Sequence, residues 1–330
     1  MHQRFFDVNR FHYDAGFSPL CAMIVDLFLT LLPIALLIAL GAGLRQQNFL
    51  ADAFWPQAER LCYFILLPAL FIHSLATADL RGLPIGNMVA VLLLATLTVA
   101  LLLLVSRRWM AVSKPAFTSI FQGGIRFNNY VGVSAAAGLL GAQGVALAAV
   151  ANATLVPTVN VLCVLVFVRL CPTDHFALKH VLLQIIRNPL VAACAIGIGL
   201  QASGWGLPPG LDSTLKTLGA ASLPLGLLCV GAALDFSAAR QWMRPVVMSS
   251  LARFVLLPLA TVLACRALGL QGPAALVALL FQAMPTASSS YILARQLGGD
   301  APLMAGIIAC QTLLAALALP VAVLLLAGWL

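Results

Sequence analysis

The sequence predicts an all-α integral membrane protein with ten transmembrane helices, arranged as two inverted five-helix repeats, with breaks in helices 4 and 9. Three observations support this class. Hydrophobic residues make up 62% of the 330 positions and charged residues only 8%, whereas a soluble domain carries about 25% charged residues. Apolar runs of the length that crosses a bilayer recur along the chain. Similar motifs also appear in the same order in the two halves.

Ten apolar runs define the predicted spans. They occupy residues 22–44, 57–77, 84–105, 115–140, 144–168, 188–203, 213–235, 245–269, 272–296 and 302–328. Residues 174–187 are amphipathic, and we expect them to lie on the membrane surface. The chain is therefore expected to comprise an N-terminal tail (1–21), a first repeat (22–168), a cytoplasmic amphipathic linker (169–187) and a second repeat (188–330).

The Lys and Arg residues of the predicted loops indicate the orientation. Ten spans place both termini on one side, which carries five basic residues, whereas the opposite side carries twelve, Arg253 among them. Because basic loops are retained in the cytoplasm, we expect both termini on the non-cytoplasmic side of an inner or plasma membrane. The net charge of +8 does not indicate a nucleic-acid partner, since the basic residues are scattered between apolar runs.

An internal repeat relates the two halves. The segment PIALLIALGAGL begins at Pro33 and PLVAACAIGIGL begins at Pro189, an offset of 156 residues. The same offset carries Leu67-Pro68 onto Leu223-Pro224. A repeat of five spans is odd, so the second copy enters the membrane from the opposite side. Such inverted repeats are typical of secondary transporters, which bind substrate near the midplane, where discontinuous helices meet.

The fourth and ninth spans carry polar interruptions at matching places. The fourth contains GGIRFNNYVGVS from Gly123, and the ninth contains MPTASSSY from Met284. Glycine and proline interrupt helices, and unpaired backbone in hydrocarbon survives only inside protein or beside a wet cavity. These interruptions predict a substrate site made of Arg126, Asn128, Asn129, Pro285, Ser288, Ser289 and Ser290.

Each of these residue types also has a structural explanation. A charge at membrane depth costs roughly 2.5 kcal/mol or more, so Arg126 either faces a cavity or an anion, or extends to the cytoplasmic end. The asparagines could instead cap broken helices, and serines bond readily to helix carbonyls. Further polar residues within spans, candidates for ligand binding or for interhelical hydrogen bonds, are Asn152, Thr154, Asn160, Gln311 and Thr312. His73 is expected to be packed or interfacial, and Asp26 is either interfacial or proton-coupling.

Four runs resemble the auxin efflux carrier family of the bile acid, auxin and arsenite transporter group. They are RFNNYVGVSAAAGLLGAQG (126–144), NPLVAACAIGIGL (188–200), ASLPLGLLCVGAAL (221–234) and MPTASSSYILARQLGGD (284–300). The resemblance implies a scaffold of spans 1, 2, 6 and 7, a mobile transport domain of spans 3–5 and 8–10, and crossing of the broken helices near the substrate. It also implies an organic anion substrate and a homodimer. Two departures are Ser134, where family members often have proline, and Phe127, which separates Arg126 from the asparagines.

The favoured function is a secondary active transporter, an efflux permease for a small organic anion such as a carboxylate or an auxin-like acid. A Na⁺- or H⁺-coupled importer of the same fold, or a channel or sensor, stays open as an alternative. An enzyme is disfavoured, because the five histidines form no HExxH pair and no facing intramembrane aspartates are evident. No cofactor is expected, and the eight cysteines form no metal-binding pairs.

Overall fold

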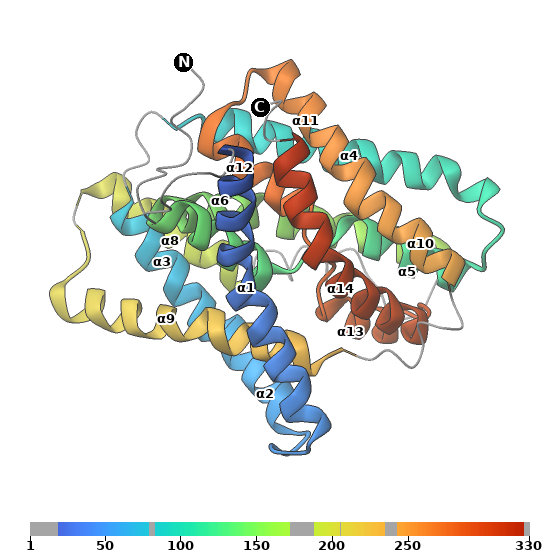
Figure 1. Ribbon diagram of the computed structural model, residues 1–330, viewed down its shortest axis with the longest axis horizontal. Coiled ribbons are helices and arrows are strands. Elements are labelled where there is room, and N and C mark those ends of the chain that lie inside the picture. Colours follow the sequence, from blue (N-terminus) through green and yellow to red (C-terminus); the bar gives the residue numbers. More distant parts are fainter. Residues whose placement is uncertain (1–18, 79–82, 172–187, 205, 235–242, 327–330) are drawn as a thin grey trace.

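The computed structural model describes residues 19–78, 83–171, 188–204, 206–234 and 243–326, and the regular structure within these ranges is entirely helical (Figure 1). The all-α prediction is therefore confirmed for this part of the chain. Most of the predicted N-terminal tail and of the predicted amphipathic linker lies outside the described residues, as does the side chain of Asp26.

Helices occupy every range that the sequence predicts as a span. The first half contains α1 (Pro19–Gln46), α2 (Phe54–Leu61), the π-helical turn η2 (Cys62–Leu66), α3 (Leu67–Thr77), α4 (Ile85–Ser106), the 3-10 turn η3 (Arg107–Trp109), α5 (Lys114–Ile125) and α6 (Asn129–Leu170). The second half contains α8 (Pro189–Ser203), α9 (Pro209–Ala232), α10 (Met243–Leu251), the π-helical turn η5 (Ala252–Leu256), α11 (Leu257–Leu268), α12 (Gly272–Gln282), α13 (Ser289–Gln296) and α14 (Ala301–Leu326).

By length and hydropathy, six helical segments of the described chain could cross a membrane. They are Phe54–Thr77, Ile85–Trp109, Lys114–Leu170, Pro209–Ala232, Met243–Leu268 and Ala301–Leu324. The segment Lys114–Leu170 covers two predicted spans, which Gly141 separates with its non-helical φ of 59° and ψ of −138°. The number of ten crossings and the inverted repeat stay predictions.

Side chains on the outer faces of the helices are apolar. On α14, Leu313, Leu317 and Val321 are exposed at four-residue spacing, which places them on one face of the helix. Leu97 and Leu101 of α4 are exposed in the same way. A continuous exposed apolar face would be unfavourable in water, so these faces are suited to lipid and support a multi-pass membrane protein.

The helices pack around α6. On one side α1 packs along α9, and α3 packs against α8 and α9 (Figure 1). On the other side α4 packs against α11, and α5 packs against α10 and α14, while α12 packs against α6 itself. Helix α6 contacts members of both groups. The assignment of one group as a scaffold and the other as a mobile transport domain stays a prediction.

Small residues allow the close approach of α1 and α9. A methyl group added at Gly41 of α1 would overlap the backbone carbonyl of Leu228 on α9. A methyl group at Gly231 of α9 would overlap the carbonyl of Ile38 on α1. Glycine at helix contacts lets backbones approach closely, and close backbone packing replaces the hydrophobic effect as the source of helix association within lipid.

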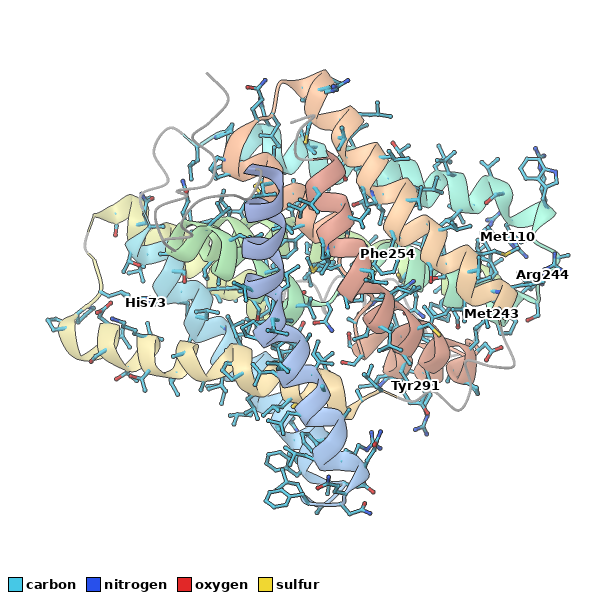
Figure 2. All side chains as sticks on the ribbon, viewed as in Figure 1. His73, Met110, Met243, Arg244, Phe254 and Tyr291 are labelled. Atoms are coloured by element: carbon cyan, nitrogen blue, oxygen red, sulfur yellow. The ribbon has the colours of Figure 1, made fainter. Side chains whose placement is uncertain are left out.

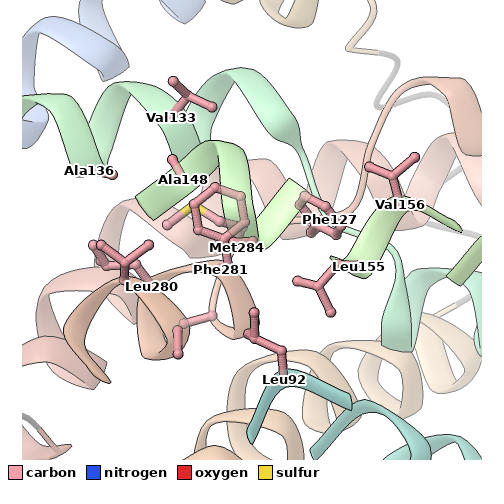
Figure 3. Packing of buried hydrophobic residues seen from close by; sticks show 14 of the residues in the cluster. Leu92, Phe127, Val133, Ala136, Ala148, Leu155, Val156, Leu280, Phe281 and Met284 are labelled. Carbon is pink, nitrogen blue, oxygen red and sulfur yellow. The ribbon is translucent and has the colours of Figure 1, made fainter. Parts of the chain in front are cut away.

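The largest hydrophobic core lies next to the helix breaks (Figure 3). Phe127, in the break between α5 and α6, packs its ring edge-to-face against Phe281 of α12, with 5.5 Å between ring centroids. Both rings are buried, and Leu92 of α4 and Leu155 of α6 belong to the same cluster. The core therefore holds the residues of the two breaks against α4 and α6.

Candidate functional site

The two predicted breaks are present and contact each other. Helix α5 ends at Ile125 and α6 begins at Asn129, while α12 ends at Gln282 and α13 begins at Ser289. The backbone N–H of Asn128 in the first break donates to the carbonyl of Pro285 in the second, over 2.8 Å. This bond satisfies one of the backbone groups that the breaks release. It brings residues far apart in the sequence to one place.

A fully buried arginine holds the carbonyl ends of both interrupted segments. Arg253 of η5 is 0% exposed. Its guanidinium donates to the carbonyls of Ile125 at the end of α5 (3.2 Å) and Phe281 near the end of α12 (2.6 Å). It also donates to the carbonyl of Met284 in the second break. Helix C-termini carry partial negative charge and carbonyls without partners, and one cation satisfies both ends here.

The position of Arg253 corrects the sequence analysis, which counted it among the basic residues of cytoplasmic loops. Arg253 lies in the π-helical turn η5, directly before the Leu257-Pro258 pair. The proline lacks the N–H that would continue the pattern of helical hydrogen bonds. Without Arg253 the predicted cytoplasmic side keeps eleven basic residues against five. The predicted orientation therefore does not depend on this residue.

Arg126 lies in the first break and extends into the protein. Its two terminal nitrogens donate to Asn160 Oδ1 on α6 (2.9 Å) and to Ser289 Oγ on α13 (3.1 Å). The side chain is half-buried, and its Nε is buried without a hydrogen-bond partner. Within the described residues, neither ion pair includes Arg126. The guanidinium is thus directed to the interior rather than to the membrane surface, and one of its donors is unused.

The adjacent asparagines have different surroundings. Asn128 is buried and caps α6, because its Oδ1 accepts from the backbone N–H groups of Tyr130 (3.1 Å) and Val131 (3.3 Å). The capping explanation that the sequence left open therefore holds for Asn128. Asn129 is half-buried, and its side chain makes no hydrogen bond to a described residue. Of the two amides, that of Asn129 is the one available to a ligand.

The three consecutive serines point in three directions, as expected at the start of a helix with 3.6 residues per turn. Ser288 Oγ donates to Glu59 Oε1 on α2 over 2.7 Å. Ser289 accepts from Arg126, and Ser290 is buried, 3.4 Å from the hydroxyl of Thr286. Ser289 thus contacts the guanidinium of Arg126, Ser288 contacts Glu59, and Ser290 faces Thr286.

Comparison with known proteins gives two matches. Residues 171–323 match the family model described as membrane transport protein. The chain is also 24% identical over 294 residues to an uncharacterized transporter of Methanothermobacter thermautotrophicus (strain Delta H), covering 88% of this chain and 95% of that protein. Both matches are to transporters, and they support a membrane transporter. The resemblance to a transporter family that the sequence predicts is thereby confirmed as a likeness to membrane transport proteins.

Polar residues on the helices next to the breaks have structural partners. Gln311 accepts from the Thr286 N–H (3.0 Å) and donates to the Gly123 carbonyl (3.1 Å), so it ties the two breaks together. Thr154 and Thr312 bond to carbonyls one turn back on their own helices. These bonds favour the structural alternative for all three residues.

Asn152 and His73 complete the predicted polar residues. Asn152 of α6 donates to the Ala148 carbonyl (2.9 Å), and its Oδ1 is buried without a partner. His73, at the left in Figure 2, is half-buried on α3 and lies 3.2 Å from Asp212 of α9. The expected packed or interfacial setting of His73 agrees with this pair, which lies on helices away from the breaks.

Sequence reasoning missed two features of the site. Glu59 reaches Ser288 from α2, a contact that the sequence analysis did not predict. Its signal was an acidic residue six positions into the apolar segment Phe54–Thr77. Gln122 is buried at the end of α5 with both amide atoms unpartnered, and in native proteins such groups usually bind water or a ligand.

Proposed function

We propose that the chain is a secondary active transporter that moves a small organic anion, such as a carboxylate or an auxin-like acid, by alternating access. The similarity to membrane transport proteins supports a transporter and a non-enzymatic role. The breaks in the predicted fourth and ninth spans support a binding site there, since substrate sites of such folds form where discontinuous helices meet.

One observation carries the proposal that the substrate is an anion. Arg126 brings a positive charge into the protein interior, without a carboxylate among its described partners and with its Nε unused. A charge at membrane depth is expensive and is retained chiefly for function. The N-termini of α6 and α13 begin beside it, and helix N-termini favour negative charge. A carboxylate here would accept from Arg126, Asn129 and Ser289.

The remaining features of the proposal follow from the fold that the family resemblance implies. Two inverted repeats of five spans would place the scaffold and the transport domain on opposite sides of this site. Both termini would face away from the cytoplasm of an inner or plasma membrane. A homodimer and efflux as the direction of transport are part of the same proposal.

The test is uptake by proteoliposomes. Labelled monocarboxylates, dicarboxylates and indole acids are presented to the wild type and to the Arg126→Gln and Asn129→Ala variants. Arg295→Gln is the matched control, because Arg295 lies on α13 but is exposed and faces the ring of Tyr291. We expect saturable uptake that is lost in both site variants and kept in the control, since only the first two remove donors from the break.

Two results would contradict the proposal. Uptake that both site variants retain would show that the polar residues of the first break are structural. Flux that does not saturate and shows no exchange with unlabelled anion on the opposite side would identify a channel. Substrate binding measured for each folded variant in detergent distinguishes a variant that has lost affinity from one that binds the substrate but does not transport it.

A further inference from the structure

Glu59 is an acidic side chain at the substrate site proposed above. It lies on α2, which packs against α9 and η2 and not along α13. Its Oε1 nevertheless accepts the hydroxyl hydrogen of Ser288 over 2.7 Å. Ser288 is the residue directly before α13, next to Ser289, the partner of Arg126. A carboxylate from one helix thus occupies the end of another with which it has no other extensive packing.

No cation neutralises this carboxylate among the described residues. The ion pairs there join Arg45 to Asp52 and His73 to Asp212. Glu59 lies within electrostatic range of Cys62 on η2, Cys229 on α9 and Tyr130 on α6. None of these is positively charged. Arg126, the nearest guanidinium at the break, bonds to Ser289 and Asn160 instead.

A substrate carboxylate bound by Arg126, Asn129 and Ser289 would lie next to Ser288, the donor that Glu59 occupies. The Ser288 hydroxyl has one hydrogen to give, and in this structure Glu59 takes it. An anion bound by Arg126 and Ser289 would place a second negative charge beside Glu59. Two carboxylates that share a site cannot both stay ionised without a large cost, so one is protonated or displaced.

We propose that Glu59 is a tethered carboxylate beside the anion position in the empty carrier, and that binding of the substrate anion is accompanied by protonation of Glu59. This inference rests on the proposed function and deepens it. The proton comes from water, passes to a Glu59 oxygen and leaves Ser288 free to donate to the substrate. The loaded site then carries one anion and one proton, so the two would cross the membrane together.

The first experiment measures proton uptake on binding. The purified protein is titrated calorimetrically with succinate and with indole-3-acetate at pH 7.5, in buffers of different ionisation enthalpy. For the wild type we expect uptake of up to about one proton per anion, and for Glu59→Gln none. The neutral amide that this variant carries repels no anion, so we expect its Kd to be about tenfold lower, the ratio that ~1.4 kcal/mol represents.

The control variant is Asp52→Asn, which removes an exposed carboxylate seven residues away from Glu59. It should keep the proton uptake and the Kd of the wild type. Equal proton uptake by the wild type and Glu59→Gln would overturn the inference. Weaker binding by Glu59→Gln at pH 7.5 would also overturn it, because Glu59 would then assist the anion rather than compete with it.

A second measurement needs no ligand. Apparent melting temperatures of Glu59→Ala, Ser288→Ala and the double variant form a double-mutant cycle. If Glu59 occupies Ser288 in the empty protein, the double variant is no less stable than the less stable single variant. If the losses in melting temperature of the two single variants add up in the double variant, Glu59 and Ser288 do not interact and the inference is overturned. Coupling in this cycle without binding of either probe to any variant would instead count against the proposed function.

Discussion

Replacing Arg253 by methionine tests whether this residue holds the two breaks together. The change removes the donors of three buried carbonyls, those of Ile125, Phe281 and Met284. A buried acceptor left without a donor costs about 1–3 kcal/mol, so three cost roughly 3–9 kcal/mol. Part of this loss is offset, because methionine needs no desolvation whereas a buried guanidinium costs several kcal/mol. We therefore expect the lower end, a loss of about 3 kcal/mol.

The assay is thermal unfolding of the detergent-solubilised protein. A loss of about 3 kcal/mol corresponds to a fall of roughly 6 °C in apparent Tm, at ~2 °C per kcal/mol for a large domain. Arg253→Lys should fall in between, since one ammonium group cannot span the carbonyls of two helix ends. Arg295→Met, on the exposed face of α13, should leave the Tm unchanged. A Tm for Arg253→Met within about 1 °C of the control would refute the role assigned to the guanidinium.

Two further predictions concern local structure. Asn128→Ala removes the cap of α6 and should lower stability by about 1 kcal/mol in an unfolding assay. Asn129→Ala should lower transport and leave stability unchanged. Equal losses of stability in the two variants would contradict this distinction. Gly41→Leu should destabilise the α1–α9 contact by at least about 1–3 kcal/mol. Gly43→Leu is its control, because nothing lies near a side chain there, and equal Tm shifts would argue against close packing.

The helices and their interruptions could be predicted because they depend on local signals. Apolar runs match the helices, and Gly123-Gly124 and Pro285 mark breaks that the structure contains. In hydrocarbon a chain has few alternatives to helix, so hydropathy and helix-breaking residues settle most of the secondary structure. Asn128 could be placed at a break for the same reason. Whether it capped the helix or bound a ligand depended on geometry that the sequence does not encode locally.

Arg253 and Glu59 could not be assigned because their partners are distant in the sequence. An arginine eight residues into an apolar run resembles an interfacial residue that extends to the headgroups. Its interior position depends on the carbonyls of two other helices, more than 25 residues away. The three serines look like one cluster in the sequence, yet only Ser288 contacts Glu59. Helical rotation separates neighbouring side chains, and tertiary packing decides which of them meet.

The two arginines at the breaks differ in how fully protein acceptors use their N–H donors. Arg253 faces the carbonyl ends of α5 and α12, and backbone acceptors take its donors. It thereby balances the negative ends of the two helix segments. At the positive N-terminal ends of α6 and α13, the acceptors are the neutral amide of Asn128, which caps α6, and Glu59, which accepts from Ser288. Arg126 adds to that positive side and keeps one donor unused. The side of the breaks that holds Arg126 therefore favours negative charge. In this structure Glu59 supplies a negative charge there.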